Sequence, residues 1–251
     1  MRSRIEWIMW GKTDPLYGVA SWPGREKTGE NPWTEQEFYA TGESEWKDFL
    51  SQWSQYGFDP HCCIEIGCGA GRLTGQLTGC FRKVYAIDIS PDVIELARRH
   101  APEATYYVTD GETLPVADGS ATAVFSTFVF RHFDRLSDAI IYFREMHRVL
   151  VPGGCMMIEF PIYNWPTKGT FFKFFYRLRK KVGDLRADFL RYWIRKGWCR
   201  PIVRELQYEI GWLCRTVEAI GFTEIEVRVF HLAINQSRHS FLFARRAPAQ
   251  N

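Results

Sequence analysis

The chain has 251 residues, of which 46% are hydrophobic and 24% are charged, with a net charge of +3. This composition is typical of a folded globular protein, and the length predicts one α/β domain with an elaboration because two full domains would be cramped. No run of eighteen apolar residues occurs, so we expect no membrane-spanning helix. The apolar stretch at the N-terminus is too short for a signal peptide, and we expect a cytoplasmic location.

The seven cysteines are odd in number and show no repeated spacing. They form no Cys-x-x-Cys pair and have no closely spaced histidines beside them, which argues against a zinc site. We therefore expect reduced, mostly buried thiols and no bound metal.

Residues 1–42 are rich in tryptophan, glycine and proline and are expected to be irregular, with helices beginning near Thr34 and at Ser44. From residue 62 onward, short apolar runs alternate with amphipathic segments. These patterns predict strands over 62–66, 84–87, 106–108, 121–128 and 156–160, and helices over 72–78, 91–100 and 136–150.

Local signals set two of these helix boundaries. Ser90 is expected to cap the helix over 91–100, with Pro91 at its first position. The turn Pro152-Gly153-Gly154 is expected to stop the helix over 136–150.

The alternation predicts a doubly wound α/β fold. Continuously apolar strands that alternate with helices imply a parallel sheet covered on both faces. The segments 224–230 and 239–245 read as two further strands, separated only by residues 231–238. A connection that short makes a hairpin, so the last strand must be antiparallel.

A glycine turn, Gly67-Cys68-Gly69-Ala70-Gly71, joins the first strand to the following helix. Glycines let the backbone turn tightly and approach a ligand, and the start of the helix offers unpaired N–H groups. A dinucleotide-binding turn would have its third glycine at position 72, which is an arginine here. Glu65 would also repel a pyrophosphate, whereas it suits the ammonium and sulfonium groups of S-adenosylmethionine.

Carboxylates follow the next two strands. Asp88 ends the second strand and can accept both hydroxyls of a ribose, while Ile89 can pack on the adenine. Asp110 follows the third strand and can accept the adenine amino group, with the backbone of Gly111 at the ring edge.

Four segments together resemble the class I S-adenosylmethionine-dependent methyltransferases over about residues 60–160. Residues 65–71 are similar to motif I of that family, Asp88 to its acidic residue after strand two, and residues 109–115 and 148–154 to two later motifs. The resemblance implies a seven-stranded sheet of order 3-2-1-4-5-7-6 with strand 7 antiparallel. It implies S-adenosyl-L-methionine as cofactor, with Cys68, Glu112 and Thr127 completing the expected binding site.

The acceptor is expected beyond the carboxyl ends of the strands, where ligands bind in such sheets. His132, after the fourth strand, and His239, at the start of the last, are candidate bases for deprotonating a hydroxyl; each could also serve only as a structural hydrogen-bonding group. We expect Phe128, Arg131 and Tyr163 to line the acceptor pocket.

The N-terminal segment, residues 1–57, is expected to form a lid on a methyltransferase domain at 58–251. Trp33 and Tyr39 are its predicted contacts with the site, because aromatic faces attract a sulfonium and exclude water. Packing against the domain without contact to the site is the alternative.

Residues 161–204 are predicted to be an inserted helical segment after the fifth strand. They contain twelve Lys or Arg and two Asp, a net charge of +10 on a body of −7, with many aromatic residues between the cations. The segment could cap the pocket for an anionic acceptor, rest peripherally on an anionic membrane, or dock on nucleic acid. A solvated basic face over packed aromatics is the fourth interpretation.

We therefore predict methyl transfer to a small or medium-sized acceptor such as a secondary metabolite, a sugar or a lipid-linked group, with oxygen as the first choice of accepting atom. The alternatives are N-methylation, an RNA or protein methyltransferase that docks through the insert, and a non-catalytic cofactor-binding module. DNA modification is disfavoured because residues 126–130 lack the Asn/Asp-Pro-Pro-Tyr-like turn of amino-group methyltransferases. The identity of the acceptor and the oligomeric state are not predicted.

Overall fold

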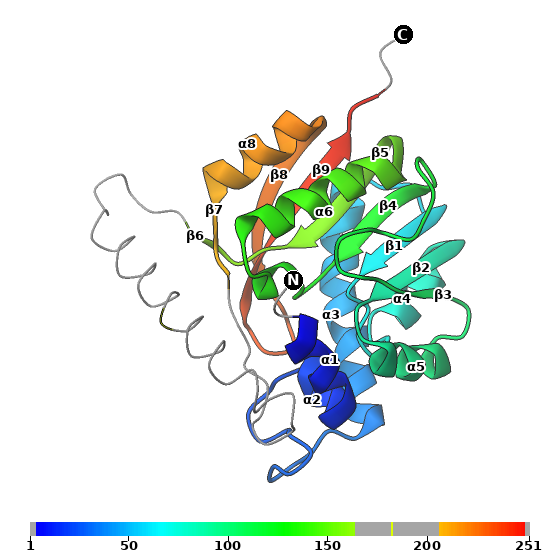
Figure 1. Cartoon of the computed structure of the whole chain (residues 1–251), viewed down its shortest axis with the longest axis vertical. Helices are drawn as coiled ribbons and strands as arrows, with labels where there is room; N and C mark the ends of the chain where they lie inside the picture. Colours follow the sequence, from blue (N-terminus) through cyan, green and yellow to red (C-terminus); the bar gives the residue numbers. More distant parts are fainter. Residues whose placement is uncertain (1–3, 164–181, 183–205, 249–251) are drawn as a thin grey trace.

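The computed structural model of the chain describes residues 4–163, 182 and 206–248 (Figure 1). Its centre is a seven-stranded sheet of order β3-β2-β1-β4-β5-β9-β8. The strands are β1 (Cys62–Ile66), β2 (Lys83–Asp88), β3 (Thr105–Val108), β4 (Ala121–Ser126), β5 (Leu150–Glu159), β8 (Phe222–His231) and β9 (Arg238–Arg246). Neighbouring strands from β3 to β5 are parallel, and β9 is antiparallel to both β5 and β8.

The predicted fold class, strand order and antiparallel last strand are therefore confirmed. Helices cover both faces of the sheet, as the continuously apolar strands required (Figure 1). The helices are α1 (Arg4–Thr13), α2 (Pro15–Val19), α3 (Glu35–Tyr56), α4 (Thr74–Cys80), α5 (Pro91–His100), α6 (Leu136–Val149) and α8 (Ile210–Ile220), with a 3-10 turn at Phe130–His132.

Two hydrophobic cores lie on opposite faces of the sheet. Side chains that alternate along each strand enter different cores: Ile64 packs in the core below α6 and α8, whereas Cys63 packs in the core below α3, α4 and α5. Val124 and Phe125 divide in the same way, and all four side chains are fully buried. The sheet thus presents no solvent-facing side at its centre, which leaves its carboxyl edge for ligand binding.

The N-terminal segment is more regular than expected. Residues 1–42 were expected to be irregular, but they contain α1, α2 and the start of α3. Thr34 and Glu37 form a capping box that begins α3, so the helix runs without interruption past Ser44 and the predicted second start there is wrong. Figure 1 shows α1 and α2 together beside α3 and α5, at one end of the sheet.

Two further boundaries differ from the predictions. Ser90 stands at the N-cap of α5, but its side chain makes no capping hydrogen bond, and its hydroxyl points toward Gly11 of α1. The turn Pro152-Gly153-Gly154 lies inside β5, which follows α6 without a loop because Leu150 already pairs with Ala121 of β4. Thr127 and Phe128 lie beyond the end of β4.

A small parallel sheet of β6 (Ile162–Tyr163) and β7 (Tyr208–Glu209) was not predicted. The helices expected within 161–204 lie outside the described residues, apart from 161–163 and 182. Within the described ranges, no helix is long and apolar enough to cross a membrane.

Phe49 links α3 to three strands of the sheet and generates a stability prediction. The ring is fully buried and contacts Phe125, Phe230 and Phe241 at centroid distances of 5.2 to 6.5 Å. Phe49→Ala should lower the free energy of unfolding by about 3–5 kcal/mol, because it removes a large ring from a packed core. The exposed neighbour Lys47 provides the control: Lys47→Ala should change the free energy of unfolding by less than about 0.5 kcal/mol. Urea unfolding of both variants measures the difference, and equal losses would contradict this packing.

Candidate functional site

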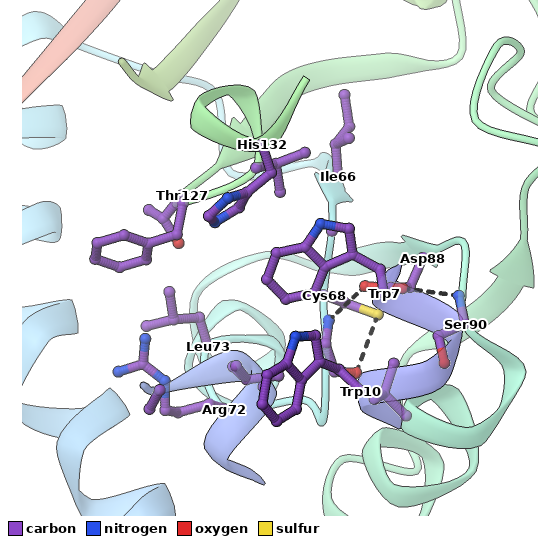
Figure 2. A pocket seen from close by; sticks show the side chains of 18 of the residues that line it. Trp7, Trp10, Ile66, Cys68, Arg72, Leu73, Asp88, Ser90, Thr127 and His132 are labelled. Atoms are coloured by element: carbon purple, nitrogen blue, oxygen red, sulfur yellow. Dashed lines mark hydrogen bonds between the residues drawn. The ribbon is translucent and has the colours of Figure 1, made fainter. Parts of the chain in front are cut away.

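A cavity of about 440 Å³ lies at the carboxyl ends of β1, β2 and β4, closed on one side by α1 and α2. Figure 2 shows the indoles of Trp7 and Trp10 projecting into it, with His132 and Thr127 toward one side and Asp88 and Ser90 toward the other. Most predicted site residues line this one cavity: Glu65, Gly67, Cys68, Gly69, Asp88, Ile89, Thr127, Phe128, Arg131, His132 and His239.

The glycine turn forms the floor of the cavity, and its geometry requires glycine. Gly67, Gly69 and Gly71 have φ angles of 75°, 53° and 86°, in the left-handed region. A Cβ on Gly67 would lie 2.1 Å from a methyl group of Val129, and one on Gly71 would lie 2.8 Å from the Cα atom of Ala97. The turn therefore packs closely against Val129 on one side and Ala97 on the other, and its backbone faces the cavity.

Asp88 ties this turn to the start of α5. Its Oδ2 accepts a hydrogen bond from the Gly69 N–H at 2.9 Å, and its Oδ1 accepts one from the Ser90 N–H at 2.9 Å. Burial raises the pKa of Asp88, while these two backbone N–H groups act in the opposite direction. Each carboxylate oxygen keeps a second lone pair, so the group can still accept two ligand hydroxyls.

Glu65 is buried in the wall of the cavity. Burial raises its pKa to about 7, although the Thr74 hydroxyl, which donates a hydrogen bond of 2.6 Å to Oε2, acts to lower it. A buried carboxylate with a raised pKa is poised to bind a cation, which would restore its charged form.

A buried ion pair beside Glu65 was missed by the sequence analysis. Arg72 and Glu45 lie 2.7 Å apart with side chains about 5% exposed, and both line the cavity. The Arg72 guanidinium also donates to the Thr41 hydroxyl at 3.2 Å. Arg72 could have been recognised as a site residue because it directly follows the glycine turn. Nothing in the sequence distinguishes Glu45 from the other residues of its long helix. Glu65 and Arg72 together offer opposite charges to a ligand that has both an ammonium and a carboxylate.

The loop after β3 departs from the expected arrangement. Asp110, Gly111 and Glu112 are absent from the residues that line the cavity, whereas Thr109 is among them. The Oδ1 atom of Asp110 accepts hydrogen bonds from the N–H groups of Glu112 and Thr113, which shape the loop and lower the pKa of Asp110. Contact of these residues with an adenine stays a prediction.

The lid residues also differ in part. Trp7 and Trp10 of α1 line the cavity, and the Trp7 ring lies 4.5 Å from that of His132. Trp33 instead donates to the Ala20 carbonyl, and Tyr39 donates to the Ala70 carbonyl. Neither they nor Tyr163, which pairs in the small sheet, line the cavity.

The end of the cavity away from the glycine turn contains a cluster of polar side chains, one of which lies behind the cavity wall. His239 and Arg131 both contact Glu159, the last residue of β5, which is 1% exposed. Sequence reasoning missed Glu159, although an acidic residue at the end of an apolar strand was a visible signal. The cavity thus joins a turn suited to a charged nucleoside ligand with a second end that carries a histidine and a paired arginine.

Comparison with known proteins agrees with this geometry. Residues 64–158 match the family described as a methyltransferase domain. The malonyl-[acyl-carrier protein] O-methyltransferase of Hahella chejuensis is 39% identical over 99 residues, 38% of this chain and 34% of that protein. The demethylmenaquinone methyltransferase of Chlorobaculum parvum is 32% identical over 100 residues, 39% of this chain and 40% of that protein. The match therefore spans well under half the length of these relatives.

Solved structures share the fold over nearly the whole chain. Magnesium protoporphyrin IX methyltransferase (ChlM) from Synechocystis PCC 6803, solved with bound SAH, has a TM-score of 0.57 at 18% identity and covers 95% of this chain and 93% of its own. The [4+2]-cyclase SpnF has a TM-score of 0.60 at 14% identity, with coverage of 98% and 97%. The fold alone thus does not decide the reaction. Residues 64–158 thus match a methyltransferase domain, and the glycine turn and the sheet order agree with the fold of the class I, Rossmann-like S-adenosylmethionine-dependent methyltransferases.

Proposed function

We propose that the chain transfers a methyl group from S-adenosyl-L-methionine to an oxygen atom of a small or medium-sized acceptor, releasing S-adenosyl-L-homocysteine. One observation carries the proposal: the same cavity is lined by the glycine turn and Asp88 at one end and by His132, Arg131 and His239 at the other. A cofactor that binds at the first end would bring its reactive group toward the second.

The residues of the cavity fit this cofactor. Asp88 would accept the ribose hydroxyls, and Ile89 would pack on the adenine. Glu65 would bind the ammonium of the methionine part, and Arg72 its carboxylate, because both side chains are buried in the wall beside the turn. Trp7 and Trp10 would cover the cofactor and favour its sulfonium through their aromatic faces.

The relatives do not fix the accepting atom. By name, one group acts on oxygen of malonyl-[acyl-carrier protein], while another includes a ubiquinone/menaquinone C-methyltransferase. Oxygen is our first choice because two histidines line the acceptor end, and nitrogen is the alternative because an amine needs less acid–base help. An anionic acceptor bound by residues 161–204, RNA or protein docking there, and a non-catalytic cofactor-binding role stay as hypotheses.

A direct test supplies the purified protein with S-adenosylmethionine and a panel of acceptors: phenols, sugars, fatty acids, amines, RNA and protein. We expect S-adenosylhomocysteine to form with a small hydroxyl-bearing compound. Formation only with RNA or protein would move the assignment to a macromolecular substrate. Tight cofactor binding without turnover of any acceptor, at every concentration tested, would favour the non-catalytic alternative.

The carboxylate of Asp88, which lines the cavity, generates a binding prediction. Asp88→Ala should weaken S-adenosylhomocysteine binding at least about tenfold, because each hydrogen bond to a charged group contributes about 1.5–3 kcal/mol. Isothermal titration calorimetry measures the affinity, and thermal melting checks that the variant is folded. The exposed Asp118, which pairs with Arg148, is the control: Asp118→Ala should bind normally. Unchanged affinity in Asp88→Ala would contradict the assignment.

The raised pKa of Glu65 predicts a pH dependence. Below about pH 7 this carboxyl is protonated, and above it the carboxylate is available for the ligand's ammonium. The affinity for S-adenosylhomocysteine should therefore rise about tenfold from about pH 6 to about pH 8, following the ionised fraction. Glu65→Gln should bind more weakly at the higher pH and lose most of this dependence. If the affinity of Glu65→Gln depends on pH as strongly as that of the wild type, another group is responsible for the pH dependence.

Methyl transfer is expected to need no metal. Among the described residues no group of three or more His, Cys, Asp or Glu could hold a metal ion. With an acceptor from the panel, activity should survive incubation with excess EDTA. Loss of activity that a divalent ion restores would show that a metal site contributes.

A further inference from the structure

Glu159 is a buried charge that the cofactor-binding role does not use. It ends β5, is 1% exposed, and lies behind the acceptor end of the cavity. Its Oε1 accepts a hydrogen bond from Arg131 at 2.5 Å and lies 3.4 Å from Nδ1 of His239. Arg131 and His239 both line the cavity, so Glu159 joins two cavity residues from behind.

The charge on Glu159 constrains the histidine. Burial alone would raise the pKa of Glu159, but the hydrogen bond with His239 and the charge of Arg131 outweigh it, so its pKa lies below the usual value. An ionised carboxylate can only accept hydrogen bonds. The Nδ1 atom that faces it must therefore carry the proton, which leaves Nε2 of the neutral ring as the proton acceptor.

The Nε2 atom faces a hydroxyl. Ser237 Oγ lies 2.6 Å from it and also contacts Oδ1 of Asn235, which accepts the Ser237 N–H at 2.9 Å. The single O–H proton of Ser237 can be directed to either neighbour. When His239 is neutral the hydroxyl donates to Nε2, and when His239 is protonated the ring donates to Ser237, which donates to Asn235. The chain of hydrogen bonds thus accommodates both protonation states.

Phe128 holds the arrangement in place. Its φ of 61° lies in the left-handed region, which a bulky residue adopts only where its surroundings require it. The His239 ring meets it edge-on at 5.2 Å, and the Arg131 guanidinium lies 5.1 Å from its centroid. Backbone strain of this kind concentrates at functional sites.

We propose that Glu159 is a positioning residue that orients His239 as the general base for a hydroxyl acceptor, an inference that rests on the proposed methyl transfer. The acceptor's O–H proton moves to Ser237 Oγ while the Ser237 hydroxyl proton moves to Nε2, and Glu159 stabilises the imidazolium that results. Bound S-adenosylmethionine supplies the methyl group: an O–C bond forms, the S–C bond breaks, and its electron pair stays on the sulfur.

The charges select the acceptor class. At the acceptor end, the arginine among the described lining residues is Arg131, and it is already paired with the buried Glu159. A carboxylate acceptor would find no uncompensated arginine in this part of the wall and would face the negative charge of Glu159 behind it. A neutral hydroxyl, a phenol or an alcohol, needs only the base, which this site provides.

Nuclear magnetic resonance tests the positioning role without any acceptor. In protein labelled with ¹⁵N-histidine, saturated with S-adenosylhomocysteine at alkaline pH, His239 should be the Nδ1–H tautomer; His239→Asn assigns its signals. In Glu159→Gln the amide oxygen should stay with Arg131 and the NH₂ group should face Nδ1, which shifts the ring toward the Nε2–H tautomer. Glu226→Gln is the matched control, because it removes the charge of an exposed glutamate paired with Arg228, and it should leave the tautomer of His239 unchanged. The same tautomer in wild type and Glu159→Gln would overturn the proposal.

Turnover tests the acceptor class with matched probes, para-substituted phenols and the corresponding benzoates. Phenols should be methylated, with turnover reduced about a hundredfold in His239→Asn and about tenfold in Glu159→Gln, the scale of general-base catalysis. The affinity for S-adenosylhomocysteine should stay within about twofold. Preference for benzoates, or phenol turnover insensitive to Glu159→Gln, would overturn the proposal. If no probe of either kind is methylated, the proposed oxygen transfer fails for these compounds, and the tautomer measurement still decides the role of Glu159.

Discussion

Asp88 holds together the two segments on which the cavity depends. Its partly buried carboxylate accepts one backbone N–H from the glycine turn after β1 and one from the start of α5. The interaction ties together the segments that follow two adjacent strands, β1 and β2. It also leaves oxygen lone pairs directed at the space between them, so one group both builds the site and can bind the ligand. Both N-terminal helices pack on this frame: Gly11 of α1 lies against Ser90, and Val19 of α2 lies against Gly69.

Charges around the cavity follow one rule: a carboxylate buried in the wall is accompanied by a group that stabilises it. Glu45 pairs with Arg72, Glu159 pairs with Arg131 and contacts His239, and Glu65 accepts from Thr74. Of these, Glu65 has its pKa raised to about 7, while that of Glu159 is lowered. The two ends of the cavity therefore differ chemically. At the cofactor end, Glu65 gains its charge when a cation binds, whereas at the acceptor end Glu159 is already ionised beside His239.

The sheet and the cofactor end could be predicted because their signals are local. Continuously apolar strands, a glycine turn and a carboxylate at a strand end are all visible in short stretches of sequence, and parallel strands bring their carboxyl ends to one edge. Asp88 was found in this way. Asp110 carried the same signal, yet its side chain bonds its own loop, because an aspartate after a strand can also form a turn.

What could not be predicted depends on distant contacts. The helix α1 contains glycine and tryptophan in a segment of weak helical pattern, and Gly11 packs so closely on Ser90 that a Cβ would lie 2.2 Å from its hydroxyl oxygen. Glu45 and Glu159 became site residues only through partners on other elements, Arg72 after β1 and Arg131 after β4. No spacing in the sequence links these pairs.

A crystal structure with S-adenosylhomocysteine tests the central claim most directly, because it shows where the sulfur lies. The account predicts the ribose hydroxyls on Asp88, the amino acid part between Glu65 and Arg72, and the sulfur directed toward Thr127, Ser237 and His239. A cofactor bound outside this cavity, or one whose sulfur is directed away from His239, would contradict it.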